Sequence, residues 1–153
     1  MSASALVRWG ALSALVGGVA LVVSDLWGLL AEGHGGGSFS EQARTASFAL
    51  TSGLTLLAAV LILFGLVGLH LRQSEAAGVV GSAGFVVAFV GTALAVGLSW
   101  ALFFVVPSLA LEVPEFLDDE RVAGPLNAGF VVSSGALAVG WALFGAGALV
   151  SGG

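Results

Sequence analysis

The chain has 153 residues, of which 58% are hydrophobic and 8% are charged, and its mean hydropathy is +1.10. Its formal net charge of -5, with only four lysines and arginines together, excludes the basic surface that nucleic acid requires. It has no cysteine, which excludes disulfides and thiolate metal sites. This composition indicates an integral membrane protein.

Four long apolar runs make up nearly all of the sequence, and short polar segments separate them. A helix needs about 20 mostly apolar residues to cross a bilayer, and each run is longer than that. Because lipid offers no partner for backbone N–H and C=O groups, each run is predicted to be a helix. The fold class is therefore all-α, with residues 1–153 forming a single transmembrane four-helix bundle in the cell membrane. The predicted helices span residues 9–31, 45–71, 78–106 and 125–150.

Loops and charges suggest how the chain crosses the membrane. The first run is too long for the apolar region of a signal peptide, so we expect it to be a retained helix. A glycine-rich loop follows it, at residues 33–37. Arg8 and Arg72 fall on one side of the membrane, and Arg44 and Arg121 fall on the other. Arginine alone gives a tie, and we favour an orientation with both termini in the cytoplasm.

Asp25 is the only acidic residue well inside a predicted helix. Thr51, Ser99 and Ser133 lie at a similar depth in the other three helices. Each of the four residues belongs to a stripe of small residues spaced by three, four or seven, and such stripes predict the faces on which membrane helices pack. We therefore expect all four side chains to meet in one polar layer. The stripe of the first helix consists of Ala11, Ala14, Gly18 and Asp25. Those of the second, third and fourth helices consist, in turn, of Ser47, Thr51, Thr55, Ala58 and Gly65; of Gly81, Gly84, Ala88, Gly91, Ala95 and Ser99; and of Gly129, Ser133, Ala136, Gly140 and Gly147.

Two interpretations of this polar layer remain open. In the structural one, Asp25 accepts hydrogen bonds from the hydroxyl groups and fixes the register of the helices. In the functional one, the layer is the floor of a cavity that opens to the outside and binds a small ligand, an ion or a proton. Arg44 lies seven residues before Thr51, hence on the same helix face, and could reach Asp25. Arg121 is the rival partner for Asp25, and a solvated Arg44 is the third alternative.

The segment 107–124 is predicted to be a loop that contains many acidic residues. Pro114 fits the first turn of a short helix over residues 114–122, which would place Phe116 and Leu117 on the membrane surface. A solvated acidic loop is the alternative. Its carboxylates do not match the spacing of a calcium-binding loop, so we expect them to be solvated.

The two histidines, His34 and His70, are predicted to lie a membrane thickness apart, and neither has a second ligand at metal spacing. We interpret both as ordinary interfacial residues. No cofactor and no metal site are predicted.

A faint repeat relates the two halves of the chain. Residues 48–53 and 130–135 both read F-x-x-[ST]-S-G, and they open the second and fourth predicted helices. A duplication would give two tandem helical hairpins of the same orientation. The residues involved are so common in this chain that a chance similarity is the alternative.

The second half also carries a resemblance to known proteins. The stretches that match are LRQSEAAG at residues 71–78, FVGTAL at residues 89–94 and the segment that continues to Pro107. On these stretches the chain resembles a group of uncharacterised small membrane proteins of high-GC bacteria. The resemblance implies a similar four-helix membrane protein, and it carries over no activity and no functional residue.

The grouped acids, bases and nucleophiles of enzymes are missing, so no enzymatic activity is expected. The first functional interpretation is a structural or accessory subunit, or a self-associating bundle. Its partners would be the lipid bilayer and either further copies of the chain or another membrane protein. The second is binding or transport of a small or lipophilic ligand through the polar layer around Asp25. Four helices are few for a transporter, so this second interpretation also implies oligomers.

Overall fold

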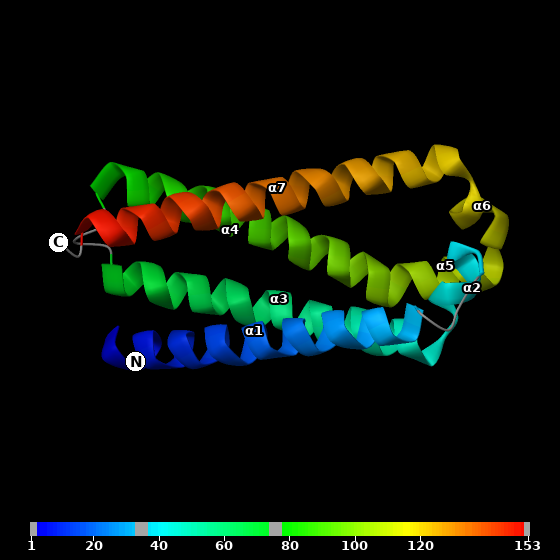
Figure 1. Ribbon diagram of the computed structural model, residues 1–153, viewed down its shortest axis with the longest axis horizontal. Helices are drawn as coiled ribbons and strands as arrows, with labels where there is room; N and C mark the ends of the chain where they lie inside the picture. The colour runs from blue at the N-terminus through cyan, green and yellow to red at the C-terminus, as the bar shows by residue number, and fades with distance from the viewer. Residues whose placement is uncertain (1–2, 33–36, 74–77, 152–153) are drawn as a thin grey trace.

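The computed structural model describes residues 3–32, 37–73 and 78–151, and these segments are almost entirely helical (Figure 1). The predicted loop segment 33–36, which includes His34, and part of the second link, 74–77, lie outside the described residues. The helices are α1 (Ala3–Glu32), α2 (Phe39–Ala43), α3 (Ala46–Gln73), α4 (Gly78–Trp100), the π-helical turn η1 (Ala101–Val105), α5 (Val106–Glu112), α6 (Pro114–Asp118) and α7 (Glu120–Ser151).

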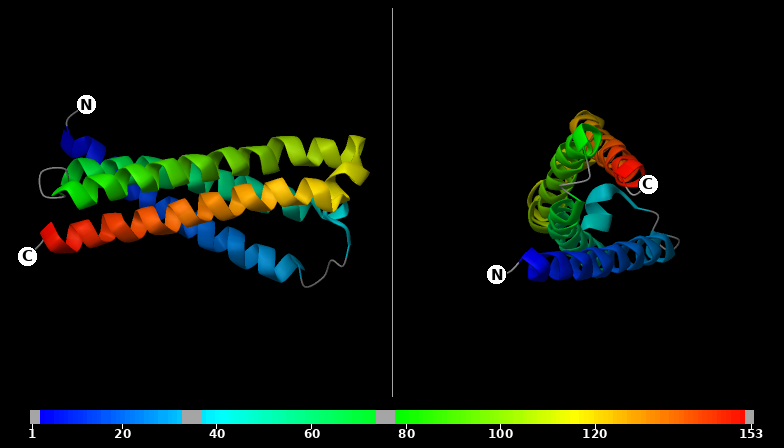
Figure 2. Two further views of the ribbon diagram at one scale, coloured as in Figure 1. Left: turned by 90° about the horizontal axis from the view of Figure 1, so that it is seen from above. Right: turned by 90° about the vertical axis from the view of Figure 1, so that its left-hand side faces the viewer.

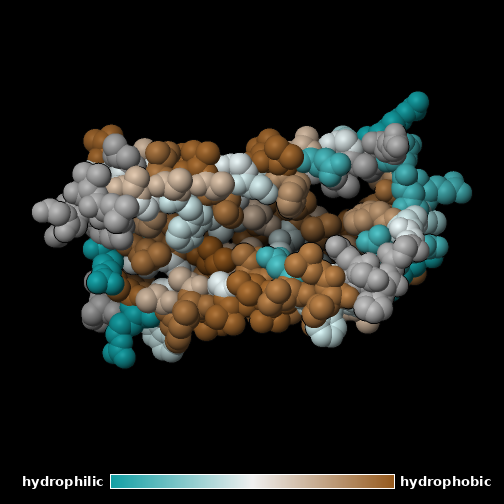
Figure 3. Space-filling model, viewed as in Figure 1, coloured by the Kyte–Doolittle hydropathy of each residue, from teal (hydrophilic) through white to brown (hydrophobic). Residues whose placement is uncertain are grey.

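Four of the described helical segments are long and apolar enough to cross a membrane, namely 5–30, 46–72, 81–112 and 127–147. On the face that Figure 3 shows, hydrophobic side chains predominate in the middle, and most of the hydrophilic ones lie toward the two ends. The prediction of an all-α transmembrane four-helix bundle is confirmed, and the protein is a multi-pass membrane protein.

The long helices pack in pairs. α1 packs on α3 and α4 packs on α7, while a smaller contact between α3 and α4 joins the two pairs. Seen along the bundle, the long helices follow one another as α1, α3, α4 and α7, so α1 and α7 stand at the two ends of this series of packed helices (Figure 2). α1 begins and α7 ends at the same end of the molecule (Figure 1). The packing is that of two tandem hairpins, and their origin by duplication stays a prediction.

Glycine allows the paired backbones to come close together. A Cβ atom added at Gly140 in α7 would collide with the backbone of Ala88 in α4. In the other pair, a Cβ atom added at Gly10 in α1 would lie 2.7 Å from the Cα atom of Gly68 in α3. Without an aqueous driving force between helices, membrane bundles depend on close van der Waals packing of this kind.

The predicted small-residue stripes of α3 and α4 do face neighbouring helices. Ala58 and Gly65 are buried on α3, and Gly84, Ala88 and Gly91 are buried on α4. Of the stripe predicted for α1, Ala14 does pack on α3, against Gly65. The other three members, Ala11, Gly18 and Asp25, were each wrong by one residue, because the buried positions are Gly10, Gly17 and Ser24. Both sets of three recur every seven positions, so spacing alone does not choose between them. A step of one residue turns the helix by about 100°, which moves Asp25 off the packing face.

The sequence predicted that the third long helix ends at Val106. In the structure it continues through Pro107 to Glu112. Proline has no N–H, and inside an α-helix its ring clashes with the carbonyl four residues earlier, which here belongs to Phe103. The π-helical turn η1 accommodates the proline. The N–H of Val106 donates to the carbonyl of Ala101, five residues back, so the helix is wider at this point.

The fourth long helix begins at Glu120 rather than at Pro125. Pro125 lies in the second turn of α7, where its missing N–H deprives only the Arg121 carbonyl of a helical partner. The loop predicted over residues 107–124 is therefore mostly helical, because it contains most of α5, all of α6 and the start of α7.

Candidate functional site

The polar contact between α1 and α3 is made by Ser24, which is 3% exposed. Its Oγ donates to the backbone carbonyl of Thr51 at 3.0 Å and lies 2.8 Å from Oγ1 of Thr55. Nearby, Nε1 of Trp27 donates to Oγ of Ser47 at 3.0 Å. These bonds fix the register of α1 against α3, which is the role that the sequence assigned to Asp25. The signal for Ser24 was its seven-residue spacing from Gly10 and Gly17.

Asp25 itself is exposed, and its side chain makes no hydrogen bond or ion pair with any residue that the structure describes. It lies five residues before Leu30, the last residue of the apolar span, hence about 8 Å inside that end at 1.5 Å per residue. The prediction that Asp25 meets Thr51, Ser99 and Ser133 is wrong, because the carboxyl points away from the packing face of α1.

The other three predicted residues are not joined to one another by hydrogen bonds. Oγ1 of Thr51 donates to the carbonyl of Ser47 in its own helix at 3.0 Å, and Oγ of Ser133 donates to the carbonyl of Gly129 at 2.8 Å. Ser99 and Ser133 are buried on α4 and α7. The ligand-binding interpretation, which required these side chains to meet Asp25, stays a prediction without that support.

Asp25 belongs to a second stripe on α1 that the rest of the described chain leaves uncovered. Its members alternate by three and four residues, which is the spacing of a helix-packing seam. Five of the six are exposed, and a Cβ atom added at the sixth, Gly18, would meet nothing within 4 Å. We call this stripe the outer seam. It consists of Ala11, Leu15, Gly18, Val22, Asp25 and Leu29.

At the end of the bundle opposite the termini, α2 and α6 are tied together (Figure 1). The backbone N–H of Ser40 donates to Oδ1 of Asp118 at 2.9 Å, and its hydroxyl donates to Oδ2 at 2.7 Å. Ser38 caps the start of α2 in a reciprocal capping box with Glu41. The sequence signal for this short helix was the S-x-x-E pattern at residues 38–41, which the prediction did not use.

Arg44 contacts α5 and not Asp25, so the alternative in which Arg44 reaches Asp25 does not hold. Its Nε donates to the carbonyl oxygen of Ala110 at 2.8 Å, and its Nη2 donates to the same atom. Ala110 lies in the last turn of α5, where carbonyls lack helical partners and a cation is favourable. The rival partner, Arg121, is exposed, and its backbone N–H donates to Asp119.

An apolar cluster lies beneath these polar bonds. Its buried members are Ala43, Val106, Ala110 and Leu117. The sequence predicted Leu117 on the membrane surface. This prediction is wrong, because α6 turns the Leu117 side chain inward. Phe116 points outward and is 51% exposed. We call the cluster, together with the bonds of Ser40 and Arg44, the outer clasp. It joins the α1–α3 connection to the α5–α6 segment and so links the two hairpins.

The hydroxyl of Ser40, and after it the Ser40 backbone N–H, hold the pKa of Asp118 below its ordinary value, with a smaller contribution from Arg44. A lowered pKa stabilises the folded form above the unfolded value of about 3.9 and loses that effect as pH falls through the folded pKa. We expect the outer clasp to be unchanged between neutral pH and about pH 5, and to loosen at more acidic pH. Amide hydrogen exchange of α2, expressed as protection factors, measures this loosening.

Asp118→Asn should reproduce the loosening of α2 at neutral pH, because the neutral amide accepts less strongly from Ser40 than the carboxylate does. The matched control is Asp119→Asn, since Asp119 is the neighbouring carboxylate and accepts its hydrogen bond from the backbone N–H of Arg121 in α7. Equal protection of α2 in both variants at every pH would show that Asp118 does not hold the clasp.

His70 was interpreted as an ordinary interfacial residue, and it is in fact half-buried between helices. Its ring stacks on Phe85 with centroids 3.8 Å apart and planes at 12°, and Phe144 lies beside it. In the described part of the chain, its Nδ1 is buried without a hydrogen-bond partner. The imidazole thus fills space where α3, α4 and α7 meet, as an aromatic residue would.

Among the described residues, no group of three or more His, Cys, Asp or Glu side chains is placed to hold a metal ion. Comparison with protein-family models, curated proteins and solved structures finds no match to this chain. The resemblance of its second half to small bacterial membrane proteins therefore stays a prediction. The structure supports the coarser statement that this is a small membrane protein with four candidate spans.

Proposed function

We propose that this protein is a self-associating structural subunit without enzymatic activity, and that its copies pack through the outer seam of α1. The observation that carries the proposal is the exposed carboxyl of Asp25 inside an apolar span. A charged carboxyl costs about 2.5–3.5 kcal/mol at the centre of a bilayer, and less toward the interface. A second copy would remove this carboxyl from lipid and give it a hydrogen-bond partner.

The composition of the outer seam suits a second copy. Ala11 and Gly18 are small enough for another helix backbone to approach closely. In a twofold dimer the same surface of both copies meets, so the two Asp25 side chains would lie near each other. A hydrogen bond between the two carboxyl groups would join the copies and take both groups out of the hydrocarbon.

α1 also has the most uncovered surface of the four spans. Within the bundle it packs only on α3 to any large extent. Buried residues make up 11% of the apolar window in α1, compared with 28% in α3. A helix with one partner and a second packing seam is suited to hold two copies together.

Cysteine cross-linking tests the proposed interface, because the chain has no cysteine of its own. Val22 and Val23 are adjacent in α1 and both exposed, but only Val22 belongs to the outer seam. We expect Val22→Cys to form a covalent dimer on oxidation in native membranes. Val23→Cys should remain monomeric. Efficient dimers from Val23→Cys but not from Val22→Cys would contradict the proposed interface.

We expect Asp25→Ala to weaken self-association about five- to thirtyfold, since hydrogen bonds between membrane helices contribute about 1–2 kcal/mol in model peptides. Energy transfer between labelled copies at increasing dilution in lipid vesicles measures the dissociation constant. Ser24→Ala is the matched control, because Ser24 faces α3. It should reduce the stability of the monomer and leave the association unchanged.

An unchanged dissociation constant for Asp25→Ala would overturn self-association through the outer seam. Recovery of a different membrane protein in equal amount with the native chain, and of no homo-oligomer, would favour the accessory-subunit interpretation instead.

We also propose that both termini face the cytoplasm. The four arginines are divided equally between the two sides of the membrane, and most of the acidic residues lie on the side away from the termini. Glu115 is exposed on α6, at the end of the bundle away from the termini. A membrane-impermeant maleimide should therefore label Glu115→Cys in intact cells. Labelling only after the cells are opened would reverse the orientation.

A further inference from the structure

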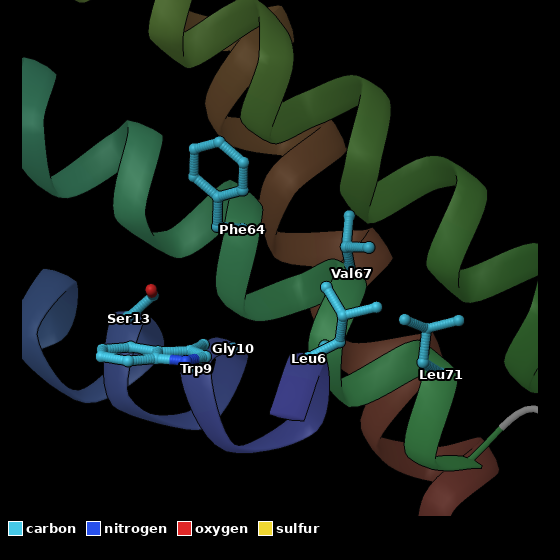
Figure 4. A pocket seen from close by; sticks show the side chains of 8 residues that line it. Leu6, Trp9, Gly10, Ser13, Phe64, Val67 and Leu71 are labelled. Carbon is cyan, nitrogen blue, oxygen red and sulfur yellow. The ribbon is translucent and has the colours of Figure 1, made fainter. Parts of the chain in front are cut away.

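A groove lies between the first turns of α1 and the last turns of α3 (Figure 4). It has a volume of about 260 Å³, and its lining includes Gly10 and Gly68, at which the backbones of the two helices come close together. Its walls are uncovered by the rest of the chain, since Trp9 and Phe64 are 62% and 64% exposed. The side chains that line the groove are Leu6, Trp9, Ser13, Phe64, Val67 and Leu71.

The groove is apolar and faces the medium that surrounds the spans. Among the described residues that line it, none has a charged side chain and Ser13 alone has a hydroxyl group. The residues come from the candidate spans 5–30 and 46–72, so the surrounding medium at this depth is the hydrocarbon of the bilayer. A groove of this kind between two membrane helices fits an acyl chain.

Two arginines are neighbours in the chain of residues that line the groove, since Arg8 directly precedes Trp9 and Arg72 directly follows Leu71. Trp9 also borders a neighbouring cavity of about 420 Å³ that is lined by Arg8. The indole N–H of Trp9 has no hydrogen-bond partner among the described residues. Arg72 ends the span of α3 at the same end of the molecule. Trp and Arg at the end of a span lie at the level of lipid headgroups.

We propose that this groove is a binding site for an anionic phospholipid of the surrounding bilayer. One acyl chain lies between Trp9 and Phe64, and the phosphate lies against the guanidinium of Arg8. Guanidinium donates two parallel hydrogen bonds to a phosphate, which gives an anionic headgroup an advantage over a zwitterionic one. The site is at the opposite end of α1 from Asp25, so it does not depend on the proposed function.

Native mass spectrometry of the full chain, released from bilayers of phosphatidylglycerol and phosphatidylcholine, tests the headgroup part of the proposal. We expect the wild-type chain to retain phosphatidylglycerol preferentially. Arg8→Gln should lower its retention roughly fivefold, which corresponds to about 1 kcal/mol for one basic side chain near the membrane surface. Arg121→Gln is the matched control, with the same loss of charge at the other end of the bundle, and should change nothing.

A steric variant tests the acyl-chain part. Ser13→Leu fills the groove, and it should lower the retention of both lipids without altering the headgroup preference. Ala93→Leu adds the same volume at an exposed position of α4, outside both the groove and the outer seam, and is the control. Equal lipid loss in Arg8→Gln and Arg121→Gln, equal loss in Ser13→Leu and Ala93→Leu, or a wild-type chain that retains no lipid would each overturn the proposal. Circular dichroism of every variant shows that the helices are intact.

Discussion

Gly140→Ala is expected to destabilise the folded monomer by about 1–3 kcal/mol, because the added methyl group overfills a packed interface. Gly140 lies on the face of α7 that packs on α4, and its new Cβ would collide with the backbone of Ala88. A backbone has no rotamer that gives way, so the two helices must separate. Separation weakens the van der Waals contacts along the whole α4–α7 pair, since lipid supplies no other force that holds the two helices together.

Gly145→Ala is the matched control on the same helix. Gly145 is exposed, and a Cβ atom added there would meet nothing within 4 Å. Alanine is the better helix former by about 1 kcal/mol, so this variant should be neutral or slightly more stable. Reversible unfolding in mixed detergent micelles, followed by circular dichroism, measures both. Equal stability of the two variants would show that α4 and α7 are not in close contact at Gly140.

The transmembrane helices could be predicted from the sequence because hydrocarbon imposes one backbone solution on long apolar runs. Their ends could not be predicted as well. Pro107 was a reasonable stop signal, but the widened turn η1 absorbs it, and a π-helical turn has no signal in the sequence pattern. The start of α7 was missed because Pro125 falls after the first turn, where proline is less common but is tolerated here.

The packing faces of α3 and α4 could be predicted because each carries one dominant stripe of small residues. α1 carries two, one beside the other, as the adjacent Gly17 and Gly18 show. Sequence spacing is the same for both stripes, so the choice depends on which one fits α3. Gly10 packs against Gly68 of α3, and the hydroxyl of Ser24 forms a hydrogen bond with that of Thr55. The packing face of α1 is thus decided by residues of α3, and it cannot be predicted from the sequence of α1 alone.

The outer clasp depends on contacts between residues far apart in the chain. Ser40 and Asp118 are separated by 78 positions, and Arg44 and Ala110 by 66. The capping box of Ser38 is a local pattern that predicts the start of α2. No local pattern predicts that Asp118 accepts hydrogen bonds from Ser40. Such pairs can be predicted only when the arrangement of the two hairpins in space is already known.

The orientation of α1 is the feature on which the proposed interface depends. If Ser24 faces α3, then Asp25 lies on the outer seam; if α1 is turned by one residue, the carboxyl enters the bundle and the seam disappears. Ser24→Ala should lower the stability of the monomer by about 0.6 kcal/mol, the average for a hydrogen bond between membrane helices. That effect is small, so a covalent measurement of the orientation is sharper.

Disulfide formation within one copy provides this measurement. The side-chain oxygens of Ser24 and Thr55 are 2.8 Å apart, so thiols at these two positions lie within reach of a disulfide. The double variant Ser24→Cys with Thr55→Cys should form an intramolecular disulfide on mild oxidation, seen by mass spectrometry of the monomer. Asp25→Cys with Thr55→Cys should form none. An intramolecular disulfide in the second variant and its absence in the first would contradict the assignment of Ser24 to the bundle and Asp25 to the outer seam.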